Sequence, residues 1–293
     1  MALITLERQG TGNESAPARH RATASNRVSP VVLLLAGGLG FAVAFLLAFF
    51  VFVRTASGQA AENGVVATAQ STLSTSDWAT PLRDGDKIAV LFGAAALLLV
   101  ISAVRKRFGL AGMGAAVLGG SLLVAHVLKL YVFTRPAFGG GQAVAGHNSF
   151  PSGHVTAAMA IVLMTMVVLP RKARPFVIAP GAIGVSWVAA STVALGWHRL
   201  SDTVGGGLLV AATCCLAAAV PAARRRRAEP VPRLSVAAAL LLPSALVTGL
   251  FLVSGTAGSE YARFAVAVIL SAVASVAIML LAYWLTLRGT RDH

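Results

Sequence analysis

Charged residues are scarce in this chain. Only 12% of its 293 residues are Asp, Glu, Lys or Arg, whereas a soluble globular domain carries about 25%. Hydrophobic residues make up 57% of the sequence. This composition excludes an ordinary cytosolic enzyme, a disordered chain and a fibrous chain. It indicates a membrane protein, because runs of about 20 apolar residues can span a bilayer.

Cysteine and acidic residues are also few. The two cysteines, Cys214 and Cys215, are adjacent inside an apolar run, so no disulfide framework is expected. No Cys-x-x-Cys pattern, Cys/His spacing or carboxylate cluster indicates a metal site. We therefore expect neither a bound metal nor a cofactor.

Long apolar segments dominate what is present. Because backbone groups in hydrocarbon must be satisfied internally, these segments predict an all-α, polytopic transmembrane bundle. We count about eight spans, or seven if one segment is re-entrant. They lie at roughly 31–53, 88–104, 108–128, 153–169, 175–197, 203–223, 234–254 and 264–287.

The chain divides into three predicted parts. Residues 1–29 are polar and read as a flexible cytoplasmic tail. Residues 30–228 form the predicted membrane core, and residues 229–293 form a C-terminal pair of transmembrane helices. The Ala, Gly, Val and Arg bias is typical of a GC-rich bacterium, which makes the plasma membrane the expected location.

The net charge of +14 could suggest a nucleic-acid partner, but its placement indicates topology instead. Lysine and arginine are enriched in cytoplasmic loops. If both termini are cytoplasmic, 17 of the 24 basic residues are too, and we expect no nucleic-acid partner. The basic run Arg224–Arg227 then serves as an anchor rather than an anionic-lipid patch. The extracytoplasmic segments are 54–87, 129–152, 198–202 and 255–263; the first is long and is expected to cap that face.

The first of three polar motifs is Lys129 followed by Arg135-Pro136. Pro136 pushes Arg135 out of the helical region, so both cations can turn toward one site. Taken alone, the motif also fits a snorkelling lysine and an interfacial arginine.

The second motif, Pro151-Ser152-Gly153-His154, opens a span. Ser152 is a good helix cap, and the free N–H groups of a helix start attract an anion. Gly153 would let that anion approach the backbone closely, with His154 at the same mouth. A simple capped helix with an incidental histidine is the alternative.

The third motif contains His198 and Asp202. Four residues apart on a helix, they share a face. A carboxylate on one imidazole nitrogen fixes the tautomer and frees the other nitrogen as a nucleophile or base. A structural His/Asp pair fits the same spacing.

Together the three motifs put two histidines, an aspartate, two cations and a helix N-terminus on one face of a membrane. Cations and backbone N–H groups match a phosphate. A carboxylate-braced histidine matches an attacking nucleophile, and a second histidine matches an acid for the leaving group. The residues therefore predict metal-independent phosphoryl transfer at a membrane surface.

In this order, the motifs resemble those of the type 2 phosphatidic acid phosphatase superfamily, which includes lipid phosphatases and vanadium haloperoxidases. The resemblance covers about 129 to 206 and implies a six-helix phosphatase-like core. It implies that His198 forms a phosphohistidine, that Asp202 orients it, and that His154 protonates the leaving alcohol. It also implies phosphate binding by Lys129, Arg135, Ser152 and the Gly153 backbone.

Two departures from the family pattern stand out. Five residues rather than six separate Lys129 from Arg135, so the helix end must differ slightly. The third family motif usually begins Ser-Arg, but here Ser191-Thr192 stands in its place. Loss of that guanidinium should weaken charge stabilisation. We hypothesise that Arg199 partly replaces it.

The leading prediction is a phosphatase acting at the extracytoplasmic face on a lipid phosphate or pyrophosphate, of polyprenyl or glycerolipid type. Its partners would be that substrate and membrane lipids. A lipid phosphotransferase using the same histidine is one alternative. A degenerate, non-catalytic lipid-binding protein is another, motivated by Thr192. An all-helical membrane chain disfavours haloperoxidase chemistry, and charges at one face rather than mid-bilayer weaken a transporter reading.

Overall fold

A computed structural model describes residues 27–72, 93, 96–97, 100–104, 106, 108–138, 148–170, 172–224, 230–256 and 258–289. Nearly all of them are helical, which confirms the all-α class. The longer α-helices are α2 (Pro30–Ala48), α3 (Ala56–Thr72), α6 (Phe108–Val127), α7 (Gly153–Val168), α8 (Pro175–Ala194), α9 (Leu200–Ala223), α10 (Arg233–Ser254) and α11 (Glu260–Gly289). Two π-helical turns, η1 (Phe49–Val53) and η3 (Leu128–Val132), extend α2 and α6.

Six helical segments of the described chain are long and apolar enough to cross a membrane. They are Pro30–Val53, Phe108–Val132, Pro175–Ala194, Leu200–Ala223, Arg233–Ser254 and Glu260–Arg288. Each matches a predicted span to within a few residues. The predicted span at 153–169 corresponds to α7, which is apolar but shorter. The predicted span at 88–104 lies largely outside the described residues.

Local chemistry explains where several helices begin. Ser29 caps α2 by accepting a hydrogen bond from the Val31 N–H at 3.2 Å, and Pro30 takes the first helical position, where its missing N–H costs nothing. Ser152 caps α7 in the same way. At the end of α6, η3 gives way to extended backbone at Phe133.

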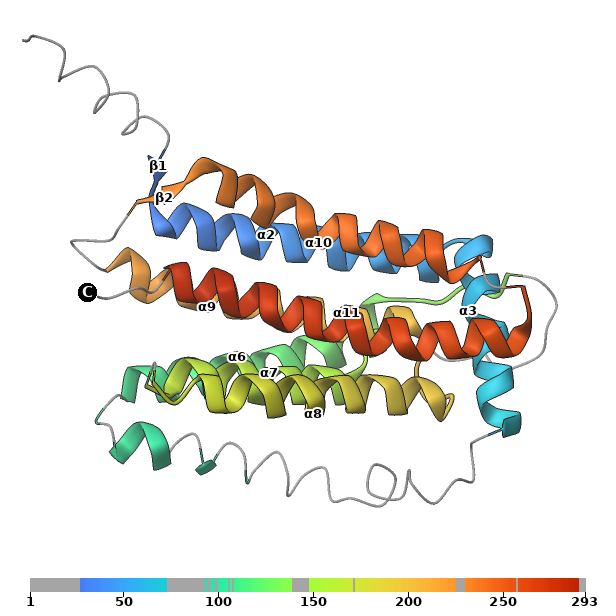
Figure 1. The fold of residues 1–293 in the computed structure, drawn as a ribbon, viewed down its shortest axis with the longest axis horizontal. Helices are drawn as coiled ribbons and strands as arrows, with labels where there is room; N and C mark the ends of the chain where they lie inside the picture. Colours follow the sequence, from blue (N-terminus) through green and yellow to red (C-terminus); the bar gives the residue numbers. More distant parts are fainter. Residues whose placement is uncertain are drawn as a thin grey trace, which may run out of the picture.

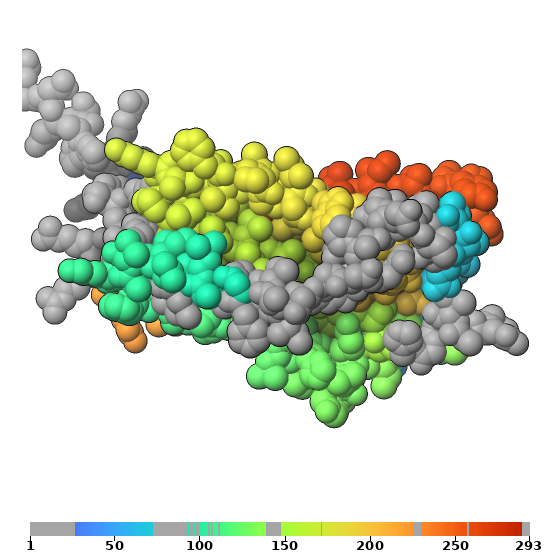
Figure 2. Space-filling model, turned by 90° about the horizontal axis from the view of Figure 1, so that it is seen from below, coloured from blue at the N-terminus to red at the C-terminus, as the bar shows by residue number. Residues whose placement is uncertain are grey.

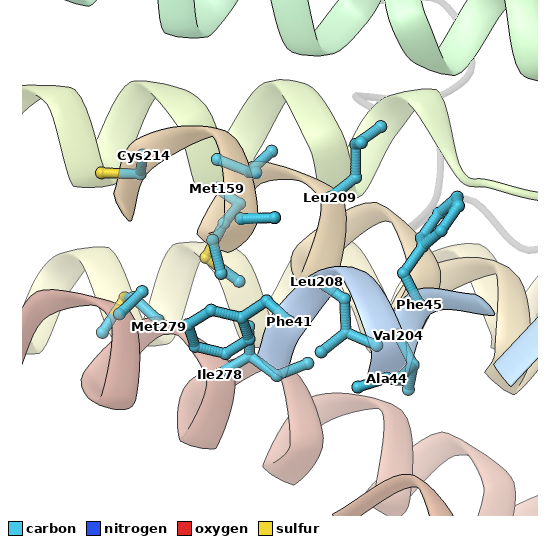
Figure 3. Close-up of a cluster of buried hydrophobic side chains, with 14 of the residues drawn as sticks. Phe41, Ala44, Phe45, Met159, Val204, Leu208, Leu209, Cys214, Ile278 and Met279 are labelled. Carbon is cyan, nitrogen blue, oxygen red and sulfur yellow. The ribbon is translucent and has the colours of Figure 1, made fainter. Parts of the chain in front are cut away.

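Helix α9 is the centre of the bundle. It packs against α2, α11, α7 and α6, while α10 lies on α2 and α11 on α8. Figure 3 shows the core between α2, α7, α9 and α11, where Phe41, Met159, Leu208 and Ile278 meet. The last two helices thus pack on the same bundle as the rest; a boundary at residue 228 stays a prediction.

Helix α3 runs across one end of the bundle instead of along it (Figure 1). At that end it contacts the beginning of α11, as Figure 2 shows from another side. The far end of the bundle holds β1 (Arg27–Val28) and the last turns of α11. The predicted capping segment, 54–87, therefore contains α3. This helix lies over the end of the bundle that is opposite to β1 and the last turns of α11.

A two-stranded β-ladder supplements the helices. β1 pairs antiparallel with β2 (Val231–Pro232), with Val28 opposite Val231. No strand was predicted here, because each strand has only two residues. The pairing ties the segment before α2 to the start of α10.

Candidate active site

His198 lies in the bend just before α9, and Asp202 lies in the first turn of α9, so the two are close although only Asp202 is on the helix. His198 Nδ1 is 3.5 Å from Asp202 Oδ2. This distance is longer than a good hydrogen bond. Both side chains are buried, with exposed fractions of 9% and 0%. The carboxylate therefore faces one ring nitrogen and leaves Nε2 on the other side of the imidazole.

The nitrogen left over, His198 Nε2, points at the second predicted histidine. It lies 3.4 Å from Nδ1 of His154, in the first turn of α7. The two rings stand edge to face, with centroids 5.6 Å apart. The second and third motifs thus meet through their histidines.

Asp202 is held by groups from two segments. Its Oδ2 accepts hydrogen bonds from Ser149 Oγ at 2.6 Å and from the Arg199 backbone N–H at 2.9 Å. Its backbone carbonyl accepts from the Ser152 N–H at 2.8 Å. These contacts fix the start of α9 against the start of α7.

Arg135 brings a guanidinium to the same place. Its side chain is 1% exposed, and none of its three nitrogens has a hydrogen-bond partner. Its Nη2 lies 3.8 Å from Asp202 Oδ1 and 3.9 Å from Glu62 Oε2. A buried guanidinium with unused donors is costly unless an anion completes it, so this arrangement suits a phosphate.

Lys129 sits in η3, half-buried and within electrostatic reach of Asp202. The π-helical turn alters the register between Lys129 and Arg135, at the place where the chain is one residue shorter than the family pattern. Asn148 holds this segment by donating to the carbonyls of Phe133 at 3.1 Å and Phe150 at 3.2 Å. The first and second motifs are thereby fixed to each other.

The start of α7 offers an open backbone. The Ser152 hydroxyl accepts from the Val155 N–H at 3.4 Å, so it acts as the helix cap. A Cβ added at Gly153 would meet no atom within 4 Å. A phosphate oxygen could therefore approach the N–H groups of this turn, which carry the positive end of the helix dipole.

Arg199 is buried behind Asp202. Its Nη1 donates to Ser149 Oγ at 3.2 Å and its Nη2 to Asn63 Oδ1 at 3.3 Å. Thr192, at the position of the family arginine, is fully buried, and its hydroxyl donates to the Ala189 carbonyl. The backbone carbonyl of Thr192 accepts from the His198 N–H at 3.0 Å. Thr192 thus shapes the turn that presents His198.

Sequence reasoning missed the contribution of α3. Glu62 accepts hydrogen bonds from the Ser201 N–H at 2.7 Å and from Ser201 Oγ at 2.9 Å. Burial is the largest influence on Glu62 and raises its pKa from 4.5 to about 7, against the lowering effect of Arg135. The one available signal was Gln59, Glu62 and Asn63 at helical spacing in a segment otherwise rich in Ala, Gly and Val. Ser149 was also missed, because a lone serine in a loop gives no pattern.

Among the described residues, no group of three or more His, Cys, Asp or Glu side chains is arranged to hold a metal ion. The site instead contains two histidines that face each other, and carboxylates that lie near a histidine and an arginine.

A family model confirms the family resemblance that the three motifs carry. Residues 91–226 match the PAP2 superfamily, and this segment, which contains all three motifs, belongs to it. No curated protein and no solved structure matched the chain. Members of the superfamily are generally phosphatases, so the match suggests a phosphatase-type membrane protein. Helices α2, α3, α10 and α11 lie outside the matched segment.

Proposed function

We propose that this protein is an integral-membrane phosphatase that hydrolyses a lipid phosphate or pyrophosphate through a phosphohistidine on His198. One observation carries the proposal. The His198 ring faces Asp202 through Nδ1 and His154 through Nε2. Asp202 also lies near the buried donors of Arg135, which have no hydrogen-bond partner. These residues come from three separate motifs and, in this proposal, would serve as nucleophile, acid and anion holder.

The first chemical step forms a bond between His198 Nε2 and phosphorus and breaks the bond from phosphorus to the leaving oxygen. The phosphoryl group takes the place of the contact between the two histidines. His154 gives its proton to the leaving oxygen, which departs as a lipid alcohol, or as a lipid monophosphate if the substrate is a pyrophosphate. Asp202 stabilises the positive charge that develops on the His198 ring.

The second step releases phosphate. Water attacks phosphorus, His154 takes a proton from that water, and the bond from phosphorus to His198 breaks. Arg135, Lys129 and the N–H groups at Gly153 would hold the phosphoryl oxygens in both steps. Ser152 supports that turn as its cap, and Arg199 supports Asp202 and Ser149 from behind.

The position of the site supports a lipid substrate. It lies toward the end of the bundle that α3 covers, away from β1 and the last turns of α11. The positive-inside rule, applied to the sequence, places that end outside the cell, with both termini in the cytoplasm. A headgroup at the membrane surface would reach the site while its chain stays among the apolar helices.

The direct test is phosphate release by the purified protein in detergent. The assay uses a panel of polyprenyl and glycerolipid phosphates and pyrophosphates, with EDTA present. We expect release by the unaltered protein and none by His198→Ala. His126→Ala is the matched control, since His126 is an exposed histidine in the last turn of α6, and it should retain full activity. A folded protein that releases no phosphate from any substrate would contradict the proposal.

Thr192 favours a second candidate, a lipid-phosphate-binding protein without turnover, because the position lacks the family's cation. That candidate predicts saturable binding of the same lipids with no phosphate release. A phosphotransferase would release no free phosphate, but it would form a new phosphoester when an acceptor alcohol is added. Adding alcohols to the panel separates these outcomes.

A further inference from the structure

Helix α3 lies outside the matched segment, yet it directs three polar side chains at the site. Gln59, Glu62 and Asn63 are three and four residues apart, so they share one face of the helix. Gln59 Nε2 donates to the Pro136 carbonyl at 2.6 Å, and Asn63 Oδ1 accepts from Arg199 Nη2 at 3.3 Å. Each residue thus contacts a segment that carries a site cation.

Glu62 occupies the middle of this face and connects two parts of the site. Its carboxylate binds both the N–H and the hydroxyl of Ser201, in the first turn of α9. The same carboxylate lies 3.9 Å from Arg135 Nη2, with both side chains at least 97% buried. Glu62 therefore positions the turn that carries Asp202 and also balances the charge of Arg135.

Arg135 nevertheless has all its hydrogen-bond donors unused. Its carboxylate neighbours, Glu62 and Asp202, stand nearly 4 Å away. They compensate its charge without saturating its donors. An anion that binds those donors brings its own negative charge close to two buried carboxylates.

We propose that Glu62 is a positioning residue of the phosphate site that holds Arg135 while no anion is bound and takes up a proton from water when an anion binds the guanidinium. The inference deepens the proposed function, because the anion in the cell would be the phosphate of the substrate or product. Binding itself requires no turnover, so the inference can be tested independently.

Glu62 rather than Asp202 is the carboxylate that accepts the proton. Asp202 Oδ2 accepts two hydrogen bonds and faces His198, and these contacts favour its charged form. Glu62 is already close to protonation, since burial raises its pKa to about 7. A nearby anion raises that pKa further, so binding above pH 7 draws one proton onto Glu62.

Several charged groups surround Glu62 and share in this balance. Arg135 and Arg199 favour the carboxylate, and Asp202 opposes it. Of the other elements that pack against α3, α8 and η1 contain no titratable residue, and α10 contains only Arg233, at its first position. The charged groups that act on Glu62 are Arg135, Arg199 and Asp202. Helix α11, which also packs against α3, contains Glu260, Tyr261 and Arg263 in its first turn.

Sulfate is the probe, because it stays a dianion between pH 6 and pH 9 while phosphate does not. Calorimetry at pH 8, in two buffers of different ionisation enthalpy, counts the protons taken up on binding. We expect the unaltered protein to take up about one proton more than Glu62→Gln. We also expect the sulfate affinity of the unaltered protein to fall with rising pH above pH 7. Per pH unit, this fall should exceed that of Glu62→Gln by a factor of up to about ten. Gln keeps the shape of Glu and can still bond to Ser201, so a purely structural role would leave both readouts unchanged.

Glu260→Gln is the matched control: it removes an exposed carboxylate from the start of α11 and should match the unaltered protein. Equal proton counts in the unaltered protein and Glu62→Gln would overturn the inference, as would the absence of sulfate binding to the folded protein. If Glu62→Gln does not fold, infrared difference spectra of the unaltered protein give the second measurement. Sulfate binding should convert a carboxylate band into a protonated carboxyl band, and unchanged bands would overturn the inference. Sulfate binding and proton uptake without any phosphate release would contradict the proposed function alone.

Discussion

Asp202 uses one carboxylate oxygen for three neighbours. Ser149, the Arg199 backbone and His198 all converge on Oδ2, while Oδ1 faces Arg135. A single atom thus sets the orientation of His198 and anchors the loop before α7. Chemistry at this position is therefore sensitive to replacing one oxygen by nitrogen.

We expect Asp202→Asn to lower kcat by about 10²–10⁴-fold. An amide cannot accept from Ser149 and the Arg199 N–H and also stabilise a cationic His198 with the same atom. Steady-state phosphate release measures the effect. Ser149→Ala is the comparison, because it removes one of the contacts and leaves the carboxylate, so its loss should be about tenfold or less. A near-normal kcat for Asp202→Asn would contradict the role of Asp202.

The two buried arginines should differ in their effects. Arg135 has no hydrogen bond of its own, whereas Arg199 binds Ser149 and Asn63. We expect Arg135→Ala to lower kcat/KM by about 10²–10³-fold, as loss of a transition-state donor does. Arg199→Ala should cost about tenfold, if Arg199 partly replaces the family arginine. Unchanged kinetics for Arg199→Ala would show that this replacement hypothesis is wrong.

Glu62 should also make the free energy of unfolding depend on pH. Its pKa is raised in the folded protein from 4.5 to about 7. The folded state therefore binds more protons than the unfolded state in that window, and stability falls as pH rises through it. The contribution is at most about 3 kcal/mol by the conversion of pKa to free energy. Thermal unfolding in detergent should show the unaltered protein losing Tm relative to Glu62→Gln between pH 5 and pH 7.5. A constant difference would contradict the shift.

Helices α7 and α9 approach closely near their first turns, next to the two histidines. A Cβ added at Gly206 would lie 2.7 Å from the Ser152 carbonyl oxygen and 3.0 Å from Thr156 Oγ1. The glycine is therefore required for the contact between the starts of these helices. The distance between His154 and His198 depends on it.

We expect Gly206→Ala to destabilise the fold by about 1–3 kcal/mol, because backbone must move to relieve the clash. Activity should fall with it, since the two histidines would be forced apart. Gly184→Ala in α8 is the matched control: its added Cβ meets nothing within 4 Å, so stability and activity should be kept or slightly improved. Thermal unfolding and phosphate release test both variants. A harmless Gly206→Ala would show that the helices can separate without consequence.

At the scale of elements, sequence patterns predicted much of what the structure contains. Apolar runs marked the spans within a few residues, because burial in hydrocarbon requires continuous hydrophobicity. The three motifs predicted residues that the fold does bring together, such as His154 and His198. Helix α3 was not predicted as part of the site, because its polar residues act by tertiary contact with segments far along the chain. The β1–β2 pair was missed because two-residue strands carry no period.

The whole molecule has two unlike ends. One holds α3, the site and the start of α11, and the other holds β1, β2 and the turn before α8. Basic residues of the described chain lie in segments at the second end, such as Lys172 in the turn before α8 and Arg233 at the start of α10. The positive-inside rule assigns the end with more basic residues to the cytoplasm. This unequal distribution of charge therefore predicts that the site faces away from the cytoplasm.

We expect Ser259→Cys, but not Lys172→Cys, to react with a membrane-impermeant maleimide on intact cells. Both positions are exposed. Ser259 directly precedes α11 and Lys172 lies in the turn before α8, and these two segments are at opposite ends of the bundle. The native Cys214 and Cys215 are buried and should add little background. Labelling after lysis confirms that both variants are present. The reverse pattern would place the site on the cytoplasmic face.

The contact between Glu62 and Arg135 also has a consequence for biosynthesis. The ribosome makes Glu62 first, Arg135 second and Asp202 last. Until the start of α9 emerges, neither Asp202 nor Ser201 exists to bind these two side chains. The carboxylate of α3 and the guanidinium of the first motif can then neutralise each other, so the nascent chain need not carry either charge alone while its helices insert.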